Sequence, residues 1–107
     1  MNLLFVDKSI KDVDIFVQSV NENTKCVMYD FFATVESLTK KIVDLGVLQY
    51  DVVGFAFEND KSGNKLFVSH KYYIDVKNND IVSNDLTNFI KMIVATYNVK
   101  IIDFLGS

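Results

Sequence analysis

The apolar residues of this chain fall into short runs and longer stripes, and the two spacings predict strands and helices respectively. Four runs are predicted to be strands, and the first of them lacks the polar alternation of a half-exposed strand, which is typical of a strand buried in a parallel sheet. These runs cover residues 3–6, 26–29, 51–57 and 100–105. The sequence therefore predicts four core strands.

Three segments between these runs repeat apolar residues every three or four positions, as amphipathic helices do. The stripes extend from Ile10 to Val20, from Val35 to Leu45 and from Leu86 to Tyr97. Thr34 is placed to cap the second helix at its start, and Gly46 is placed to end it.

Two shorter β-rich runs, 65–69 and 72–76, predict a hairpin, and residues 77–80 have the composition of a turn. Helices between buried strands imply parallel strands joined by right-handed crossovers. We therefore expect a single α/β domain over 1–107: a mostly parallel four-stranded sheet flanked by three helices, with a small β-hairpin insertion.

Composition narrows the class of protein. The chain has 107 residues, half of them apolar, which suits one domain with a real core. All 11 basic residues are Lys, and 14 acidic residues give a net charge of -3, so a nucleic-acid surface is not expected. No run is long enough to cross a bilayer, and the N-terminus does not resemble a signal peptide. We expect no membrane association, and a soluble protein that is intracellular rather than secreted.

Acidic residues follow three of the predicted strands, at the edge where open parallel sheets bind ligands. Asp7, Asp30 and Glu58 could together hold Mg²⁺, as in a phosphotransfer site or a receiver-like switch. The alternative interpretation is that acids after strands begin turns and cap the next helix. We favour the second interpretation and expect no cofactor.

Two residue types capable of nucleophilic or base chemistry occur once each. His70 falls in the predicted hairpin turn, where exposed polar residues are ordinary, and Cys26 lies inside an apolar run, as a small core residue does. A single Cys and a single His also exclude a disulfide framework and a site built of several Cys or His ligands. No catalytic set emerges from these residues.

Aromatic pairs offer a different kind of site. Phe31-Phe32 and Tyr72-Tyr73 each place two rings side by side in sequence, so that one ring can pack inward while the other stays exposed. Exposed aromatic rings favour protein contacts. These four residues are the candidate contact surface, with another protein or a second copy of the chain as the partner.

Short stretches along nearly the whole chain resemble a domain of unknown function found near the N-termini of large bacterial adhesins. That domain is related to the caspase- and gingipain-like peptidase clan. The stretches that carry the resemblance are 3–9, 26–30, 50–57, the hairpin around Leu66 and Tyr73, the helix from Leu86, and 101–107. The resemblance implies a caspase-like or flavodoxin-like α/β sandwich, and the chain would then be a fragment or an N-terminal module of a longer protein.

The same resemblance places a His-Gly pair after the third strand and a Cys after the last one, as the base and nucleophile of a cysteine peptidase. The matching positions here are Glu58-Asn59 and Ser107. A carboxylate does not replace an imidazole tuned near neutral pH, and a hydroxyl without a base is a poor nucleophile. We therefore expect a non-catalytic protein-interaction or self-assembly module, with a magnesium-dependent acidic site as the alternative and a residual peptidase as the weaker one.

Overall fold

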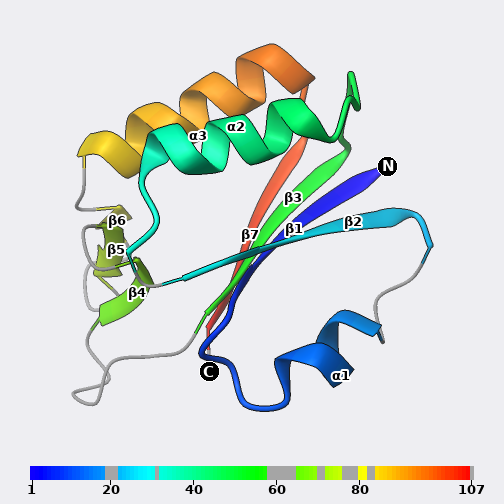
Figure 1. Ribbon diagram of the computed structural model, residues 1–107. Helices are drawn as coiled ribbons and strands as arrows, with labels where there is room; N and C mark the ends of the chain where they lie inside the picture. The colour runs from blue at the N-terminus through cyan, green and yellow to red at the C-terminus, as the bar shows by residue number, and fades with distance from the viewer. Residues whose placement is uncertain are drawn as a thin grey trace.

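The structure is a computed structural model, and it describes residues 1–18, 22–30, 32–57, 65–69, 72–75, 80–81 and 84–106. Its main sheet lies between two helices on one face and one helix on the other (Figure 1). The strands of this sheet are β1 (Asn2–Asp7), β2 (Thr24–Tyr29), β3 (Val52–Phe57) and β7 (Ile101–Gly106). The helices are α1 (Val13–Gln18), α2 (Val35–Asp44) and α3 (Asn84–Tyr97).

The main sheet is parallel throughout, with the strand order β2-β1-β3-β7. The chain moves outward from β1 to β2 and then returns past β1 to β3, so the direction of winding reverses between β1 and β3. This is the order of a flavodoxin-like doubly wound sheet. The predicted fold class, a parallel four-stranded sheet with three helices, is confirmed.

Three phenylalanines in register form the centre of the core. Phe5 of β1 is paired with Phe55 of β3, and Phe55 is paired with Phe104 of β7. The ring centroids are 4.9 Å and 5.5 Å apart, and both pairs are stacked. Phe89 of α3 meets Phe5 edge-on at 6.0 Å. These rings place the largest apolar groups on the sheet face that α2 and α3 cover.

The opposite face has a smaller cluster beneath α1. Leu4, Val6 and Ala56 are buried there, and Val13 and Val17 of α1 pack against them. This helix begins later than the stripe from Ile10 predicts, and residues 19 and 20 at the end of the stripe lie outside the described residues. Ile10 still packs against the cluster but precedes the helix, since its N–H donates to the Asp7 carbonyl and Asp12 has a positive φ of 56°. A left-handed residue at position 12 prevents the helix from beginning earlier.

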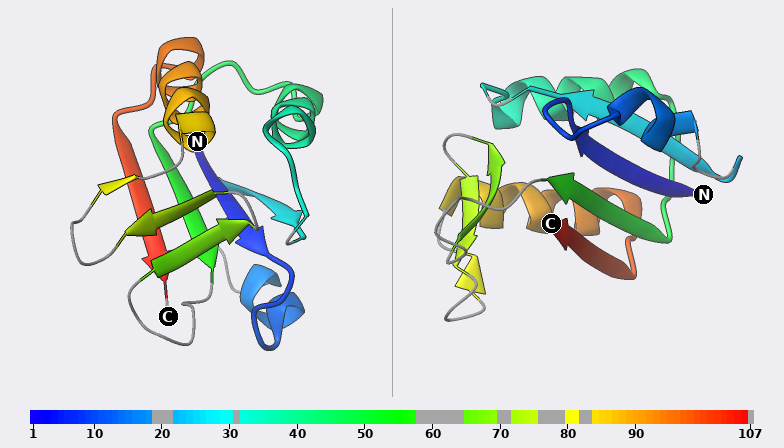
Figure 2. Two further views of the ribbon diagram at one scale, coloured as in Figure 1. Left: turned by 90° about the vertical axis from the view of Figure 1, so that its left-hand side faces the viewer. Right: turned by 90° about the horizontal axis from the view of Figure 1, so that it is seen from below.

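The predicted hairpin is present as β4 (Lys65–Ser69) and β5 (Tyr72–Asp75), which pair antiparallel. It forms a second sheet beside the start of α3 (Figure 2). The prediction of a turn over 77–80 is wrong at its end, because Asp80 and Ile81 form a third strand, β6, against β5. A strand of two residues is too short to give a periodic signal in the sequence.

Helix α2 begins and ends where the sequence predicts. Thr34 Oγ1 accepts from the Ser37 N–H at 3.1 Å, and Ser37 Oγ accepts from the Thr34 N–H at 3.0 Å. These reciprocal bonds form a capping box and satisfy two backbone donors at the helix start. Gly46 ends the helix with a φ of +69°, a conformation that favours glycine.

A glycine inside the predicted strand 51–57, Gly54, suggests close packing against a helix, but the structure shows a different neighbour. A Cβ at this position would lie 3.0 Å from Leu4 Cδ1, on the neighbouring strand β1, and no helix atom lies within 4 Å. The close approach that glycine permits is therefore between adjacent strands, where the Leu4 side chain leans over β3.

We expect Thr34→Ala to lower the free energy of unfolding by about 1 kcal/mol, because the capping box loses the acceptor for the Ser37 N–H. Thr96→Ala, at an exposed position of α3, is the matched control and should change stability by less than about 0.5 kcal/mol. Urea titration of both variants measures the difference. Equal stability of the two variants would show that the cap does not hold α2 in place.

Candidate functional site

The carboxyl edge of the sheet carries the acids that the sequence singles out. Asp7, the last residue of β1, is 5% exposed. Its Oδ1 accepts from the Ser9 N–H and from the Ser9 hydroxyl, each at 2.9 Å. A buried carboxylate needs such donors to offset the loss of water. Through these hydrogen bonds Asp7 fixes the turn that leads toward α1.

Asp30 follows β2 and has the same local role. Its Oδ1 accepts from the Phe32 N–H at 2.8 Å, in the turn that leads to α2. Within the described ranges there is no group of three His, Cys, Asp or Glu side chains that could hold a metal ion. Glu58, the third residue of the magnesium alternative, lies outside the described residues.

A second polar group is buried beside Asp7. The Tyr29 side chain is 1% exposed, and its hydroxyl has no hydrogen-bond partner among the described residues. Burial raises the pKa of this hydroxyl far above its ordinary value of 10, and the charge of Asp7 raises this pKa further. Tyr29 therefore stays neutral at every physiological pH and is no candidate base.

Cys26 has the core role that the sequence predicts. It is partly buried and packs against the cluster beneath α1. Burial raises the pKa of its thiol above 9.0, so the thiolate, the reactive form, is scarce at neutral pH.

The positions that match the peptidase dyad cannot be placed. Phe57, the end of β3, pairs with Gly106, the end of β7, so the two strands finish side by side at one edge. Glu58, Ser107 and His70 lie outside the described residues.

Of the four aromatic contact candidates, Phe32 is the one whose side chain the structure describes. It is 73% exposed, and it stands beside the start of α2. Phe31 lies outside the described residues, and for Tyr72 and Tyr73 only the backbone of β5 is described. The contact hypothesis for these four residues stays a prediction.

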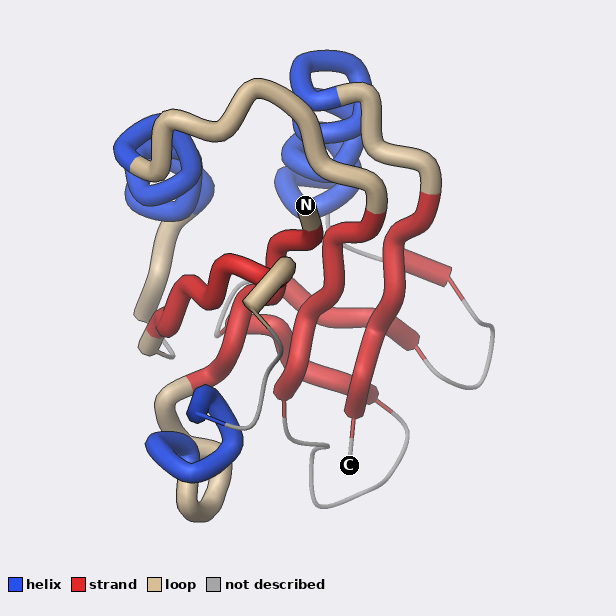
Figure 3. The backbone as a smooth tube through the Cα atoms, turned by 90° about the vertical axis from the view of Figure 1, so that its right-hand side faces the viewer, coloured by secondary structure: helices blue, strands red, loops and turns tan. Residues whose placement is uncertain are grey.

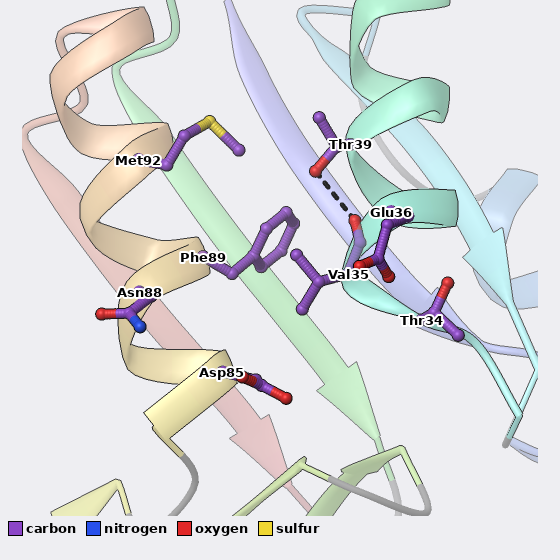
Figure 4. A pocket seen from close by; sticks show the side chains of 8 residues that line it. All are labelled: Thr34, Val35, Glu36, Thr39, Asp85, Asn88, Phe89 and Met92. Carbon is purple, nitrogen blue, oxygen red and sulfur yellow. Dashed lines mark hydrogen bonds between the residues drawn. The ribbon is translucent and has the colours of Figure 1, made fainter.

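A groove of about 480 Å³ separates the first turns of α2 and α3. Figure 4 shows Val35 and Phe89 pointing toward one another from the two helices, with Met92 further along. Glu36 and Asp85 line the groove, each in the first turn of its helix. Carboxylates at that position stabilise a helix by complementing its dipole, so their presence has an explanation without a ligand.

An exposed apolar surface lies on β7, on the sheet face opposite α2 and α3. Ile102 and Phe104 pack against the main core, so the alternate residues Ile101, Asp103 and Leu105 point to the other face. Ile101 and Leu105 are each 52% exposed, and Asp103 is exposed between them. We call these three residues the open face.

The sequence gives no direct signal for the open face. The run from Lys100 to Leu105 predicts a core strand, and only the tertiary arrangement shows that α1 packs beneath β1, β2 and Ala56 of β3 and leaves β7 bare (Figure 2).

Comparison with protein-family models, with curated proteins and with solved structures found no match to this chain. The resemblance to the adhesin-associated domain is thus carried by the quoted residues alone. In the described part of the chain, the helices are all too short or too polar to cross a bilayer.

We expect the Tyr29→Phe variant to gain stability relative to the wild-type chain as pH rises. At pH 7 its free energy of unfolding should be about 1 kcal/mol higher than that of the wild type, because the substitution removes a buried hydroxyl without a partner. Above about pH 10 the unfolded chain ionises Tyr29 while the folded chain keeps it protonated, so the wild type loses a further ~1.4 kcal/mol per pH unit that the variant does not lose.

Urea titrations of both proteins at pH 7, 10 and 11 measure this difference. All other groups titrate alike in the two proteins, so the change in the difference reports Tyr29 alone. A difference that stays constant from pH 7 to pH 11 would contradict the raised pKa.

Proposed function

We propose that this chain is a non-catalytic protein-contact module that associates with a second copy of itself through the open face. The observation that supports this proposal is the incomplete cover of the parallel sheet. Parallel sheets are found with both faces covered, because both faces carry apolar side chains. Here two helices cover one face, whereas on the other face α1 packs against β1, β2 and Ala56 of β3 and leaves Ile101 and Leu105 of β7 half-exposed.

A second copy fits the open face because the two apolar residues of the face can pack against the same two residues of another copy. Ile101 and Leu105 are four residues apart, which is about 13 Å along a strand. A two-fold axis through the level of Asp103 reverses the strand direction and so brings Ile101 of one copy to Leu105 of the other. Two aliphatic side chains per copy then leave water together.

The magnitude of this burial predicts a weak dimer. Complete burial of an Ile or Leu side chain is worth about 2 kcal/mol, so four half-exposed side chains supply about 4 kcal/mol. Association itself costs at least that much in lost freedom of motion, and additional contacts at the rim are needed. A dissociation constant near 1 mM then requires about 4 kcal/mol from the rim, so the dimer is expected to be no tighter than millimolar.

Asp103 sets the electrostatics of this contact. It lies midway between Ile101 and Leu105, so the two-fold axis places the two Asp103 carboxylates near one another. Like charges opposed in this way are unfavourable. The negative charge of Asp103 therefore weakens the proposed dimer, and a neutral residue at this position would strengthen it.

The alternative functions have less support from the described residues. The Asp7 and Asp30 carboxylates both accept hydrogen bonds from their own turns, which accounts for their position without magnesium. No contact among the described residues assembles a base and a nucleophile for a peptidase.

Sedimentation velocity over a range of concentrations tests the proposal. We expect the wild-type chain to form dimers as its concentration rises toward about 1 mM, and Leu105→Lys to stay monomeric because it places a charge in the contact. Leu48→Lys is the matched control, since Leu48 is an exposed apolar residue outside the open face, in the loop between α2 and β3, and it should dimerise like the wild type. Asp103→Asn should tighten the dimer about threefold or more.

A wild-type chain that stays monomeric throughout this range would overturn the proposal. Dimerisation that Leu105→Lys leaves intact but Leu48→Lys abolishes would place the contact elsewhere. Far-UV circular dichroism of each variant verifies that the fold is kept.

A further inference from the structure

The outer edge of β7 presents unpaired backbone groups beside the open face. The Ile101 N–H donates to the Asp51 carbonyl at 3.2 Å, so Ile101 directs its backbone toward β3. Backbone direction alternates along a strand, and Ile102 and Phe104 therefore direct their N–H and C=O groups away from β3. Among the described residues, β7 has a strand neighbour on one side only, and Figure 3 shows it at the margin of the main sheet, ending beside the C label.

These outward groups are placed for a symmetric pairing of two β7 strands. A two-fold axis at Asp103, perpendicular to the sheet, makes the two strands antiparallel and sets Ile102 of one copy opposite Phe104 of the other. Opposite residues that both direct their groups to the neighbour exchange two N–H···O=C bonds. This pair occurs twice about the axis, so four main-chain hydrogen bonds form. On the open face, the same axis sets Ile101 of one copy opposite Leu105 of the other.

We propose that two copies of the chain associate edge to edge, with their β7 strands paired antiparallel, so that two four-stranded sheets join into one continuous sheet. The inference rests on the self-association proposed above and specifies its geometry: the open faces lie side by side in one sheet and are not stacked on each other. Each main-chain hydrogen bond is worth about fivefold in an association constant, so four bonds add about 10³-fold. This is the size of the rim contribution that a millimolar dimer requires.

Asp103 lies on the axis of this pairing. Its backbone faces β3, as that of Ile101 does, so the two Asp103 residues form a non-hydrogen-bonded pair with Cα atoms about 4.5 Å apart. Residues directly opposite in antiparallel strands share a face of the sheet, and the two carboxylates therefore repel each other. The short distance between the two Cα atoms also makes position 103 a reporter of the geometry.

The pairing ends at two copies because it uses both β7 edges and leaves the β2 edges at the two ends of the joined sheet. The Tyr29 carbonyl accepts from the Lys8 N–H at 2.9 Å, so Tyr29 faces β1 and the Met28 carbonyl points outward. Lys41 Nζ donates to that Met28 carbonyl at 2.9 Å. A lysine on the edge of a sheet hinders the pairing of another strand there, so the assembly closes as a two-fold dimer.

Disulfide formation at position 103 tests the edge pairing. A disulfide joins Cα atoms about 4.4–6.8 Å apart, and edge pairing brings the two residues 103 to about this distance, whereas stacked sheets lie about 10 Å apart. In a buffer of reduced and oxidised glutathione, we expect Asp103→Cys to form at least tenfold more linked dimer than Leu48→Cys. Leu48 is exposed and lies outside the open face, so it reports chance collisions. Mass spectrometry locates the disulfide, since Cys26 is also present.

A mixture of Ile101→Cys and Leu105→Cys tests the register. The mixed disulfide should exceed either symmetric one at least tenfold, because the axis sets 101 opposite 105 and separates two copies of residue 101 by about 13 Å along the strands. In the Asp103→Cys linked dimer, the Ile102 and Phe104 amides should exchange with solvent at least tenfold more slowly than in the reduced protein, as measured by NMR. Far-UV circular dichroism of each reduced variant verifies its fold.

The edge pairing is overturned if Asp103→Cys links no more readily than Leu48→Cys, or if the Ile102 and Phe104 amides of the linked dimer are unprotected. If the wild-type chain still dimerises in sedimentation velocity, the self-association proposed above holds and only its edge-to-edge geometry is refuted. A wild-type chain that stays monomeric would refute both.

Discussion

The stack of Phe5, Phe55 and Phe104 across three parallel strands is the constraint on which the rest of the structure depends. In a strand, a shift of one residue sends every side chain to the opposite face. Three stacked rings, met edge-on by Phe89 of α3, would all be lost from the core by such a shift. The stack therefore fixes the register of the sheet and determines which face needs the larger cover.

The second face is the consequence of that choice. With the aromatic rings directed toward α2 and α3, the alternate positions of β1 and β3 hold Leu4, Val6, Gly54 and Ala56, which need only a thin layer above them. A single helix, α1, is enough for this purpose. This helix does not cover β7, so Ile101 and Leu105 of that strand stay half-exposed. The unequal loading of the two faces thus accounts for the open face without any functional assumption.

Sequence patterns were sufficient for the elements that depend on local or strongly periodic signals. Apolar runs predict the four core strands, and Thr34 and Gly46 predict the bounds of α2 because caps act within one turn. Sequence patterns do not show which parts of a sheet face are covered by a helix, because that depends on segments far apart in the chain. The start of α1 depends on a left-handed Asp12, and the mostly apolar run at β7, interrupted by Asp103, is compatible with either one or two buried faces. The acids after β1 and β2 were open to two interpretations, and the turn bonds of Asp7 and Asp30 are visible only in three dimensions.

The two edges of the sheet show how charge can keep such a fold from uncontrolled pairing. A parallel sheet with bare edges would extend from copy to copy, since each edge is a row of unpaired donors and acceptors. At the edge of β2, the Lys41 ammonium occupies the outward carbonyl of Met28 and so hinders pairing with another strand. At β7, the Asp103 carboxylate is exposed on the open face, and a symmetric approach of two copies brings two such charges together. Lys41 thus protects the edge of β2, whereas Asp103 keeps association through the open face weak and reversible.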